Sequence, residues 1–427
     1  MNENERVRTY LATAFTEPIR DPLWNHIYLP REIARLTEPE PFQQLARIKQ
    51  LGPTYLVYPG ATHTRLNHSL GVFHIARRMI EHLLAFSDAP EVSLPGIKAF
   101  LAASLLHDLG HFPFTHSLKG LPLTEHEELT GRVILESELH GIIRDEIATD
   151  PELVAAIVDD GFEHANGNEV GLYRRLLSGS LDPDKLDYLN RDAYFCGVPY
   201  GLQDIDYVLS RLRPNGYSGI AVDITGVSAV ENILFSKYQM YRAVYWHRTV
   251  RVATAMIKKV LFMALRDGAV APRDLYGLDD DLFYGRFADS SYAPLALLKA
   301  VYNRRLHKTI VDVPYRADFA GHGALETMDG RYEVEERIRS LLSRRTGAEV
   351  KPQEVVVDLP EKISFETTFP VRDGEQRIDF TESGTVFRPE VVERFVHTLR
   401  RVRVSVAPGI QERLPETDWA RELGLHE

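Results

Sequence analysis

Histidine is concentrated in one short stretch of this 427-residue chain. Eight of the 16 histidines lie between His63 and His126, where an even distribution would place about two or three. Histidine is the commonest metal ligand and the side chain best suited to proton transfer near neutrality. The stretch therefore predicts a metal site or a proton-transfer site. The alternative is a chance gathering of histidines on helix surfaces.

His107 and Asp108 carry the clearest indication of a metal site. They end an almost continuously apolar segment, residues 97–109, which predicts a buried helix that stops before Gly110 and Pro113. An ionisable pair is costly in such a place unless something compensates its charge. Adjacent helical residues diverge by about 100°, so both can approach one metal only beyond the helix end. Other segments must complete such a site.

His68 and Asp184 are the candidates for completing it. Two imidazoles and two carboxylates suit a divalent metal of intermediate hardness, and four ligands leave room for water and a substrate oxygen. The alternative is structural, with Asp182, Asp184 and Asp187 solvating the start of a helix. In that case Asp182 would be the N-cap and Pro183 the first helical residue.

The elements that would position these residues are mainly helical. Apolar residues repeat at three-and-four spacing from Val72 to Leu84, which predicts an amphipathic helix opened by His68. Residues 227–267 contain neither Gly nor Pro and predict one long helix or two nearly collinear ones. Residues 275–290 suggest a mobile acidic loop.

The pattern changes after about Pro314. Residues 355–357, 363–365 and 378–380 are short β-like runs, and residues 333–345 and 389–402 have a helical pattern. We therefore expect a mainly α protein, with a helical core at residues 1–315 and a smaller α+β region at residues 316–427.

Composition narrows the class of protein. The chain is 44% hydrophobic and 26% charged, as in soluble globular proteins, and its single cysteine excludes an internal disulfide framework or a cysteine-based metal cluster. The N-terminal residues lack the pattern of a secretory signal, and no stretch approaches the ~18 apolar residues of a membrane span. We expect a cytoplasmic protein without membrane association. The net charge of −11 argues against strong nucleic-acid binding.

The order His, His-Asp, Asp resembles the HD-domain phosphohydrolases. More narrowly, the sequence is similar to the deoxynucleoside triphosphate (dNTP) triphosphohydrolases, the group that contains the SAM- and HD-domain triphosphohydrolase and its bacterial relatives. The resemblance runs from about residue 18 to residue 307 and is carried by residues 48–52, 58–63, 65, 68–72, 107–116, 126–127, 182–188 and 191–192. It implies an HD-domain helical core, without a SAM domain, because few residues precede the matched part.

The resemblance gives each candidate residue a role. Four residues would hold one divalent metal ion per active site, of an identity (Mg, Mn, Fe, Co, Ni or Zn) that the sequence does not distinguish: His68, His107, Asp108 and Asp184. Three residues would serve catalysis, with the first donating a proton to the leaving oxygen at a pKa near neutrality: His126, His111 and Glu127.

The remaining candidates would bind substrate. The triphosphate would be contacted by Arg65, Lys185, Tyr188 and Lys237, and the sugar by Gln50, Leu51, Tyr188 and Asp192. His116 would bind substrate close to His126. The ring of Tyr245 would lie against the sugar and leave no room for a 2′-hydroxyl. The alternatives are that Arg65 and Lys185 are surface charges and that Tyr245 is an ordinary core residue.

Two departures from the family pattern limit what carries over. Lys237 stands where the animal-type enzyme has an arginine, which keeps the charge but loses the bidentate fork. In the regulatory guanine pocket of that enzyme an Asp, a Gln and an Arg are expected, and this chain has Glu38, Gln43 and Ala46 there. Only Gln43 matches, so guanine-nucleotide activation either is absent or uses different residues.

We therefore expect a dNTP triphosphohydrolase, in which water attacks the α-phosphorus and releases deoxynucleoside and inorganic triphosphate. One alternative is an HD phosphohydrolase for another nucleotide, a 5′-monophosphate or a cyclic dinucleotide. Another is a nucleotide-sensing binding protein with a vestigial site. By analogy with the family we expect a homo-oligomer, for example a tetramer. The negative average charge does not exclude a phosphorylated substrate, because the basic candidates would form a locally positive pocket.

Overall fold

The apolar segment before His107 forms the buried helix that positions it. This helix, α5 (Leu94–Leu106), starts at Ser93, whose side chain accepts a hydrogen bond from Gly96 N, and it places His107 at its C-cap. The predicted amphipathic helix is α4 (Arg65–Leu83), which begins three residues before His68. Helix α4 packs against α5 and against α10 (Pro183–Cys196). Both predicted helices are thus confirmed, with shifted ends.

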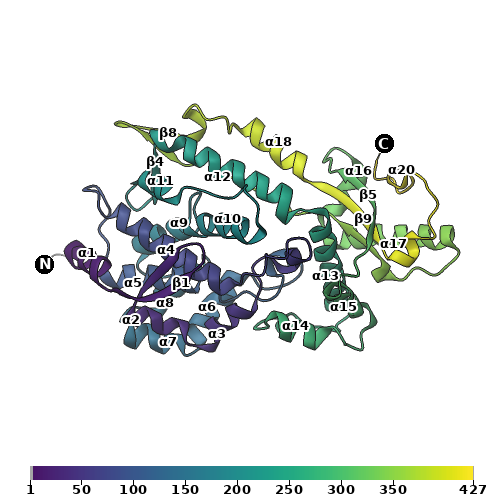
Figure 1. The fold of residues 1–427 in the computed structure, drawn as a ribbon, viewed down its shortest axis with the longest axis horizontal. Coiled ribbons are helices and arrows are strands. Elements are labelled where there is room, and N and C mark those ends of the chain that lie inside the picture. Colours follow the sequence, from purple (N-terminus) through teal and green to yellow (C-terminus); the bar gives the residue numbers. More distant parts are fainter. Residues whose placement is uncertain (1–2, 427) are drawn as a thin grey trace.

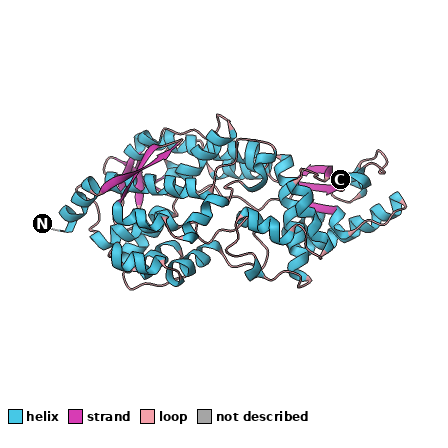
Figure 2. Ribbon diagram, turned by 60° about the horizontal axis from the view of Figure 1, so that its bottom comes forward, coloured by secondary structure: helices cyan, strands magenta, loops and turns pink. Residues whose placement is uncertain are grey.

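The computed structural model describes residues 3–426, which form an elongated, mainly helical molecule with strands gathered towards its two ends (Figures 1 and 2). The other helices of the first 210 residues are α1 (Glu3–Thr13), α2 (Arg31–Ala34), α3 (Glu40–Gln44), α6 (His126–Glu136), α7 (Leu139–Gly141), α8 (Pro151–Val158), α9 (Gly167–Leu177) and α11 (Ile205–Ser210). A hairpin of β1 (Phe15–Asp21) and β2 (Asn25–Pro30) lies between α1 and α2.

Residues 227–267 do not form one continuous helix, so that prediction is wrong in part. Helix α12 (Val227–Met240) passes into a π-helical turn, Tyr241–Tyr245, and α13 (Arg248–Arg266) starts after two non-helical residues. The π turn closes with a hydrogen bond from Trp246 N to Tyr241 O, and the His247 side chain caps α13. Figure 1 shows α12 and α13 running in different directions.

The predicted acidic loop at residues 275–290 is also wrong, because it contains a helix. Helix α14 (Asp280–Phe287) buries Phe283 and Phe287, and Asp279 caps its start by accepting a hydrogen bond from Leu282 N. The run of aspartates is therefore an N-terminal capping sequence. Helix α15 (Ala296–Tyr302) follows and packs on α13.

Two larger sheets connect distant parts of the chain. One has the order β3 (Leu212–Pro214), β4 (Ile220–Asp223), β7 (Pro370–Asp373) and β8 (Gln376–Asp379), with β4 and β7 parallel. The other has the order β5 (Lys308–Pro314), β9 (Arg401–Val406) and β6 (Val355–Asp358), all antiparallel. Strands β7 and β8 thus extend a sheet that begins near the middle of the chain, and β5 pairs with the last strand. The division between residues 315 and 316 stays a prediction.

The last hundred residues are α+β, as predicted, with three differences in detail. The helical pattern at 333–345 lies inside the longer α17 (Met328–Thr346), and α18 (Pro389–Leu399) ends before residue 402 because β9 begins at Arg401. Residues 361–369 form neither helix nor strand, so the β-like run at 363–365 is wrong. The remaining helices are α16 (Ala320–Gly323), α19 (Pro408–Gln411) and α20 (Trp419–Glu422). Within the described residues, no helix is long and apolar enough to span a membrane.

Candidate metal and phosphate site

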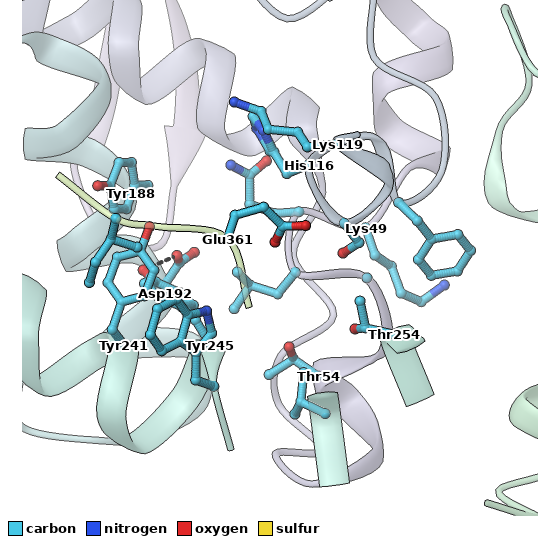
Figure 3. Close-up of a pocket in the computed structure, with 18 of the residues that line it drawn as sticks. Lys49, Thr54, His116, Lys119, Tyr188, Asp192, Tyr241, Tyr245, Thr254 and Glu361 are labelled. Atoms are coloured by element: carbon cyan, nitrogen blue, oxygen red, sulfur yellow. Dashed lines mark hydrogen bonds between the residues drawn. The ribbon is translucent and has the colours of Figure 1, made fainter. Parts of the chain in front are cut away.

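A cavity of about 500 Å³ lies where α4, α5, α10, the α12–α13 junction and the extended residues 361–364 meet (Figure 3). Most of the predicted site residues line it: Gln50, Leu51, Arg65, His68, His107, Asp108, His116, His126, Asp184, Tyr188, Asp192, Lys237 and Tyr245. Three predicted residues lie outside its wall: Lys185, His111 and Glu127. The fold therefore gathers most of the set from distant parts of the sequence into one cavity.

Three of the four predicted metal ligands form a close group at one end of this cavity. The ligand atoms of His68, His107 and Asp184 all lie within 4.8 Å of one another. His68 Nε2 is 2.8 Å from Asp184 Oδ1, and His107 Nε2 is 3.9 Å from the same oxygen. Asp108 adjoins the group, with its Oδ1 3.4 Å from His107 Nε2. Asp184 therefore contacts His68 and does more than solvate the start of a helix.

The protonation of His107 fits a metal ligand. Its Nδ1 lies 3.0 Å from the carbonyl oxygen of Ser104, a hydrogen bond in which the nitrogen must donate. The lone pair of the neutral ring is then on Nε2, which is buried and has no hydrogen-bond partner among the described residues. An unpaired buried acceptor beside two carboxylates is unfavourable unless a cation binds there.

The electrostatics around His68 also favour a cation. Burial alone would lower its pKa, but hydrogen bonds to Asp184 and Asp187 raise that pKa to about 10. Without a metal, the ring therefore carries a positive charge between two carboxylates. A divalent cation would satisfy the same carboxylates in place of that proton, so the residues present fit the metal that their types predict.

A second group of three imidazoles lies beside the metal group. His111 Nε2 is 3.1 Å from His116 Nε2, and the rings of His111 and His126 have centroids 4.0 Å apart. Burial lowers the pKa of His126 to about 4, which differs from the predicted pKa near neutrality. Glu127 Oε2 lies 3.0 Å from His126 Nδ1, although that nitrogen makes no hydrogen bond within the described chain.

The predicted phosphate-binding cations differ in how free they are. Arg65 donates to Asp108 Oδ2 over 2.8 Å and keeps a buried Nε without a hydrogen-bond partner in the described structure. Lys237 Nζ donates to the carbonyl of Ser364 over 2.9 Å. The ammonium of Lys185, by contrast, is 2.6 Å from Asp182 Oδ2 and is held away from the cavity.

Asp192 joins the residues predicted to face the sugar. Its Oδ2 accepts a hydrogen bond from Tyr245 OH over 2.6 Å, and its Oδ1 lies 2.8 Å from His63 Nε2. Tyr188 meets Tyr245 edge-on, with ring centroids 6.5 Å apart. Tyr245 belongs to the π-helical turn, so the interruption of the long helix sets where this ring points.

Several parts of the cavity wall were not predicted from the sequence, among them Lys119 and residues 361–364. Lys119 lies beside His116 at its rim and is exposed (Figure 3). It follows the histidine motif by three residues, so a search for basic residues next to the motif could have found it. Residues 361–364 also line the cavity, and Figure 3 shows Glu361 among the residues around it. They lie so far along the chain from the motif that no spacing rule indicates them.

Comparisons with known proteins match most of the chain. Residues 65–188 match the family described as HD domain, and residues 206–403 match the HD associated region. The uncharacterized protein YwfO of Bacillus subtilis is 39% identical over 57% of this chain and 55% of its own length. The uncharacterized protein MJ1154 of Methanocaldococcus jannaschii is 32% identical over 70% of this chain and 60% of its own length. The chain thus spans little more than half the length of these two relatives.

Other relatives are matched over more of their length. The deoxynucleoside triphosphate triphosphohydrolase SAMHD1 homolog of Dictyostelium discoideum is 23% identical over 98% of this chain and 82% of its own length. A crystal structure of a hypothetical protein from Aquifex aeolicus superimposes with a TM-score of 0.68 at 28% identity, covering 92% of this chain and 97% of the other. A phosphohydrolase from Bacteroides thetaiotaomicron shares the fold, with a TM-score of 0.69 at 22% identity over 91% and 99% of the two chains.

Proposed function

The chain belongs to the HD-domain proteins, and from this premise we propose that it is a metal-dependent phosphohydrolase that splits a dNTP into deoxynucleoside and inorganic triphosphate. The observation that carries the proposal is the buried Nε2 of His107, which has no hydrogen-bond partner in the described part of the chain and faces two carboxylates in the same cavity as the basic residues. The printed name of the Dictyostelium relative supports the choice of substrate class.

A divalent cation held by His68, His107, Asp108 and Asp184 would polarise a phosphate oxygen and lower the pKa of the attacking water. Arg65 would bind phosphate next to it, because one of its guanidinium nitrogens already holds Asp108 and its free Nε can donate to a phosphate oxygen. Lys237 and Lys119 would add positive charge along the same cavity.

His126 would carry the proton to the departing 5′-oxygen of the nucleoside. Its neutral form predominates at pH 7, because burial lowers its pKa to about 4. A bound polyphosphate brings several negative charges, which favour the protonated imidazole and raise that pKa. The protonation of His126 would thus follow substrate binding, with Glu127 as a nearby acceptor and His111 and His116 as neighbours.

Asp192, Tyr188 and Tyr245 would select the sugar. The hydroxyl of Tyr245 is held by Asp192, so the ring has one fixed position from which it excludes a 2′-hydroxyl. Gln50 and Leu51 would complete this end of the cavity, where the buried Oε1 of Gln50 has no hydrogen-bond partner among the described residues.

Product analysis tests the proposal directly. The purified chain is incubated with Mn²⁺ and with each dNTP, singly and in mixtures, and the products are separated by ion-exchange chromatography. Inorganic triphosphate and deoxynucleoside are expected, and pyrophosphate with a monophosphate would contradict attack at the α-phosphorus. The variant His68→Ala controls for contaminating hydrolases. Light scattering tests the proposed homo-oligomer, for which a tetramer is the expected form.

A second candidate is an HD phosphohydrolase for another nucleotide. The observation that favours it is the engagement of Lys185 by Asp182 and Glu366, which leaves fewer cations for a triphosphate. Turnover of 5′-monophosphates or cyclic dinucleotides, without turnover of dNTPs, would establish it. Nucleotide binding without any product would indicate a sensing protein instead.

A further inference from the structure

His68 is held from both sides by carboxylates with different surroundings. Its Nε2 faces Asp184 at the edge of the cavity, while its Nδ1 lies 2.9 Å from Asp187 Oδ2 in the protein interior. The side chain of Asp187 is completely buried, and that of Asp184 is 39% exposed. Asp187 therefore has no access to the cavity, and its effect on a bound metal must pass through His68.

Both carboxylate oxygens of Asp187 already accept two hydrogen bonds each. Its Oδ1 accepts from Trp24 Nε1 over 2.6 Å and from one nitrogen of Arg191 over 2.9 Å. Its Oδ2 accepts from Arg191 Nε over 2.8 Å in addition to His68 Nδ1. Four donors thus converge on a group that only accepts, so His68 Nδ1 must carry the proton. Nε2 is then the nitrogen whose lone pair can face the metal.

The β1–β2 hairpin holds this arrangement in place. Arg191 also donates to Asp21 Oδ2 over 2.9 Å, and Asp21 Oδ1 accepts from the backbone nitrogens of Leu23 and Trp24 over 2.8 Å each. The turn that carries Trp24 is therefore fixed by the same arginine that fixes Asp187. Asp21, Asp187 and Arg191 are all buried.

Gly71 shows how closely α4 and α10 must approach for these contacts. A Cβ at this position would lie 1.9 Å from Asp187 Oδ1 and 2.5 Å from a nitrogen of Arg191. Those distances are too short for any side chain, so only glycine leaves space for the pair. This explains a glycine three residues after His68 within the motif.

We propose that Asp187 is the positioning residue for His68, and that Trp24 and Asp21 of the hairpin hold it, so that an element outside the matched residues 65–188 sets the metal affinity of the site. The inference rests on the metal site of the proposed function. Carboxylates that orient a ligating histidine fix its tautomer and raise its basicity, and losing one typically weakens metal binding about 10–100-fold.

Two variants of the full chain test this, with one control that matches the tryptophan change. Trp24→Phe keeps the aromatic ring stacked on His74 but removes the hydrogen bond to Asp187. Asp187→Asn keeps the size but places an amide donor among four donors. The control, Trp419→Phe, makes the same tryptophan-to-phenylalanine change in a core far from the site, among residues packed on β5, β6 and β9. Binding of Mn²⁺ to the metal-free protein is measured by calorimetry, and the visible absorption of bound Co²⁺ reports the ligand geometry.

We expect Mn²⁺ affinity to fall about 10–100-fold in Asp187→Asn and by a smaller factor in Trp24→Phe, with a changed Co²⁺ spectrum in both and none in Trp419→Phe. Wild-type affinity and spectrum in both variants, even with a lower unfolding temperature, would overturn the inference and leave the proposed function intact. If Asp187→Asn does not fold, Trp24→Phe alone decides. A wild-type protein that binds neither Mn²⁺ nor Co²⁺ would overturn the proposed function together with the inference.

Discussion

Glu366 Oε2 lies 3.2 Å from Lys185 Nζ and links the extended residues 361–369 to the start of α10. Glu366 and Asp182 raise the pKa of Lys185 against the opposing effect of burial, so the lysine stays charged and paired. In the proposed function, a polyphosphate must compete with Glu366 for this ammonium.

Replacing Glu366 is therefore expected to strengthen polyphosphate binding. Glu366→Gln removes one of the two carboxylates that compete for Lys185 and leaves Asp182 in place. It should lower the KM for dNTP about two- to five-fold, a modest effect because Asp182 still pairs with the lysine and Glu366 is partly exposed. Steady-state kinetics and calorimetry with tripolyphosphate measure it. Glu375→Gln, at an exposed position between β7 and β8, is the control. An unchanged or raised KM in Glu366→Gln would show that the pair does not restrain Lys185.

Loss of a metal ligand should abolish metal binding and activity together. Asp108→Ala removes a carboxylate that touches both His107 and Arg65, and His68→Ala removes the ring that bridges Asp184 and Asp187. Each should lower the bound metal, measured by elemental analysis after dialysis against Mn²⁺, to background. His397→Ala, an exposed histidine on α18, should leave it unchanged. Full turnover in either ligand variant would refute the site.

Two variants distinguish the contribution of the Tyr245 ring to sugar selection from that of its hydroxyl. Tyr245→Ala should admit ribonucleotides and lower the ratio of dNTP to rNTP turnover by at least about 10-fold, the loss of ~1.4 kcal/mol of discrimination. Tyr245→Phe keeps the ring and loses only the hydrogen bond to Asp192, so most of the discrimination should remain. Competition assays with paired substrates measure both ratios. Equal ratios in Tyr245→Ala and the wild type would remove this ring from sugar selection.

Lys119 is expected to contribute to phosphate binding although it lies outside the recognised motif. Lys119→Ala removes a positive charge at the cavity rim and should raise the KM for a triphosphate substrate about five- to ten-fold, with a smaller effect in Lys119→Arg. Lys308→Ala, at an exposed position on β5, serves as the control. Tripolyphosphate affinity that is identical in Lys119→Ala and the wild type would contradict the role.

Stability should fall in mild acid because of His74. Burial, followed by Arg78 and Arg77, lowers its pKa from 6.5 to about 4. The unfolded chain therefore binds the proton first as the pH falls, so the free energy of unfolding declines between about pH 6.5 and pH 4, by at most about 3 kcal/mol from this group.

Urea unfolding at pH 7 and at pH 4.5 measures this decline. His74→Gln should make it shallower, while His397→Gln should reproduce the wild-type decline. A His74→Gln protein that loses as much stability as the wild type between the two pH values would show that His74 is not responsible.

Most residues that the sequence singled out line one cavity, because imidazoles and carboxylates were chosen for a chemistry that requires them to lie together. Their role as metal ligands stays a prediction. The sequence also predicted α4 and α5, where apolar periodicity and burial agree. It missed the break at Trp246, since no Gly or Pro stands there and the π turn depends on packing that brings Tyr245 to Asp192. The sequence at residues 275–290 suggests a loop because its aspartates are polar. The helix α14 that Asp279 caps depends on the packing of Phe283 and Phe287.

Contacts between residues far apart in the sequence determine how free the two predicted phosphate-binding lysines are. Lys185 carries a charge suited to phosphate, but Glu366 lies beside it only because β7 pairs with β4 and brings the end of the chain back. Lys237, which lines the cavity as predicted, donates to the carbonyl of Ser364 through the same return of the chain. No local pattern around either lysine contains this information.

The parallel pairing of β4 with β7 has a consequence for how the protein is made. During synthesis the chain emerges from its N-terminus, and α4, α5 and α10 can pack long before residue 371 is available to pair with Val222. Residues 361–364 can complete the cavity only after β7 has paired with β4. Strands so far apart in the sequence pair slowly, so this step is expected to slow folding. Until then a growing chain can hold the proposed metal ligands together while the cavity still lacks residues 361–364.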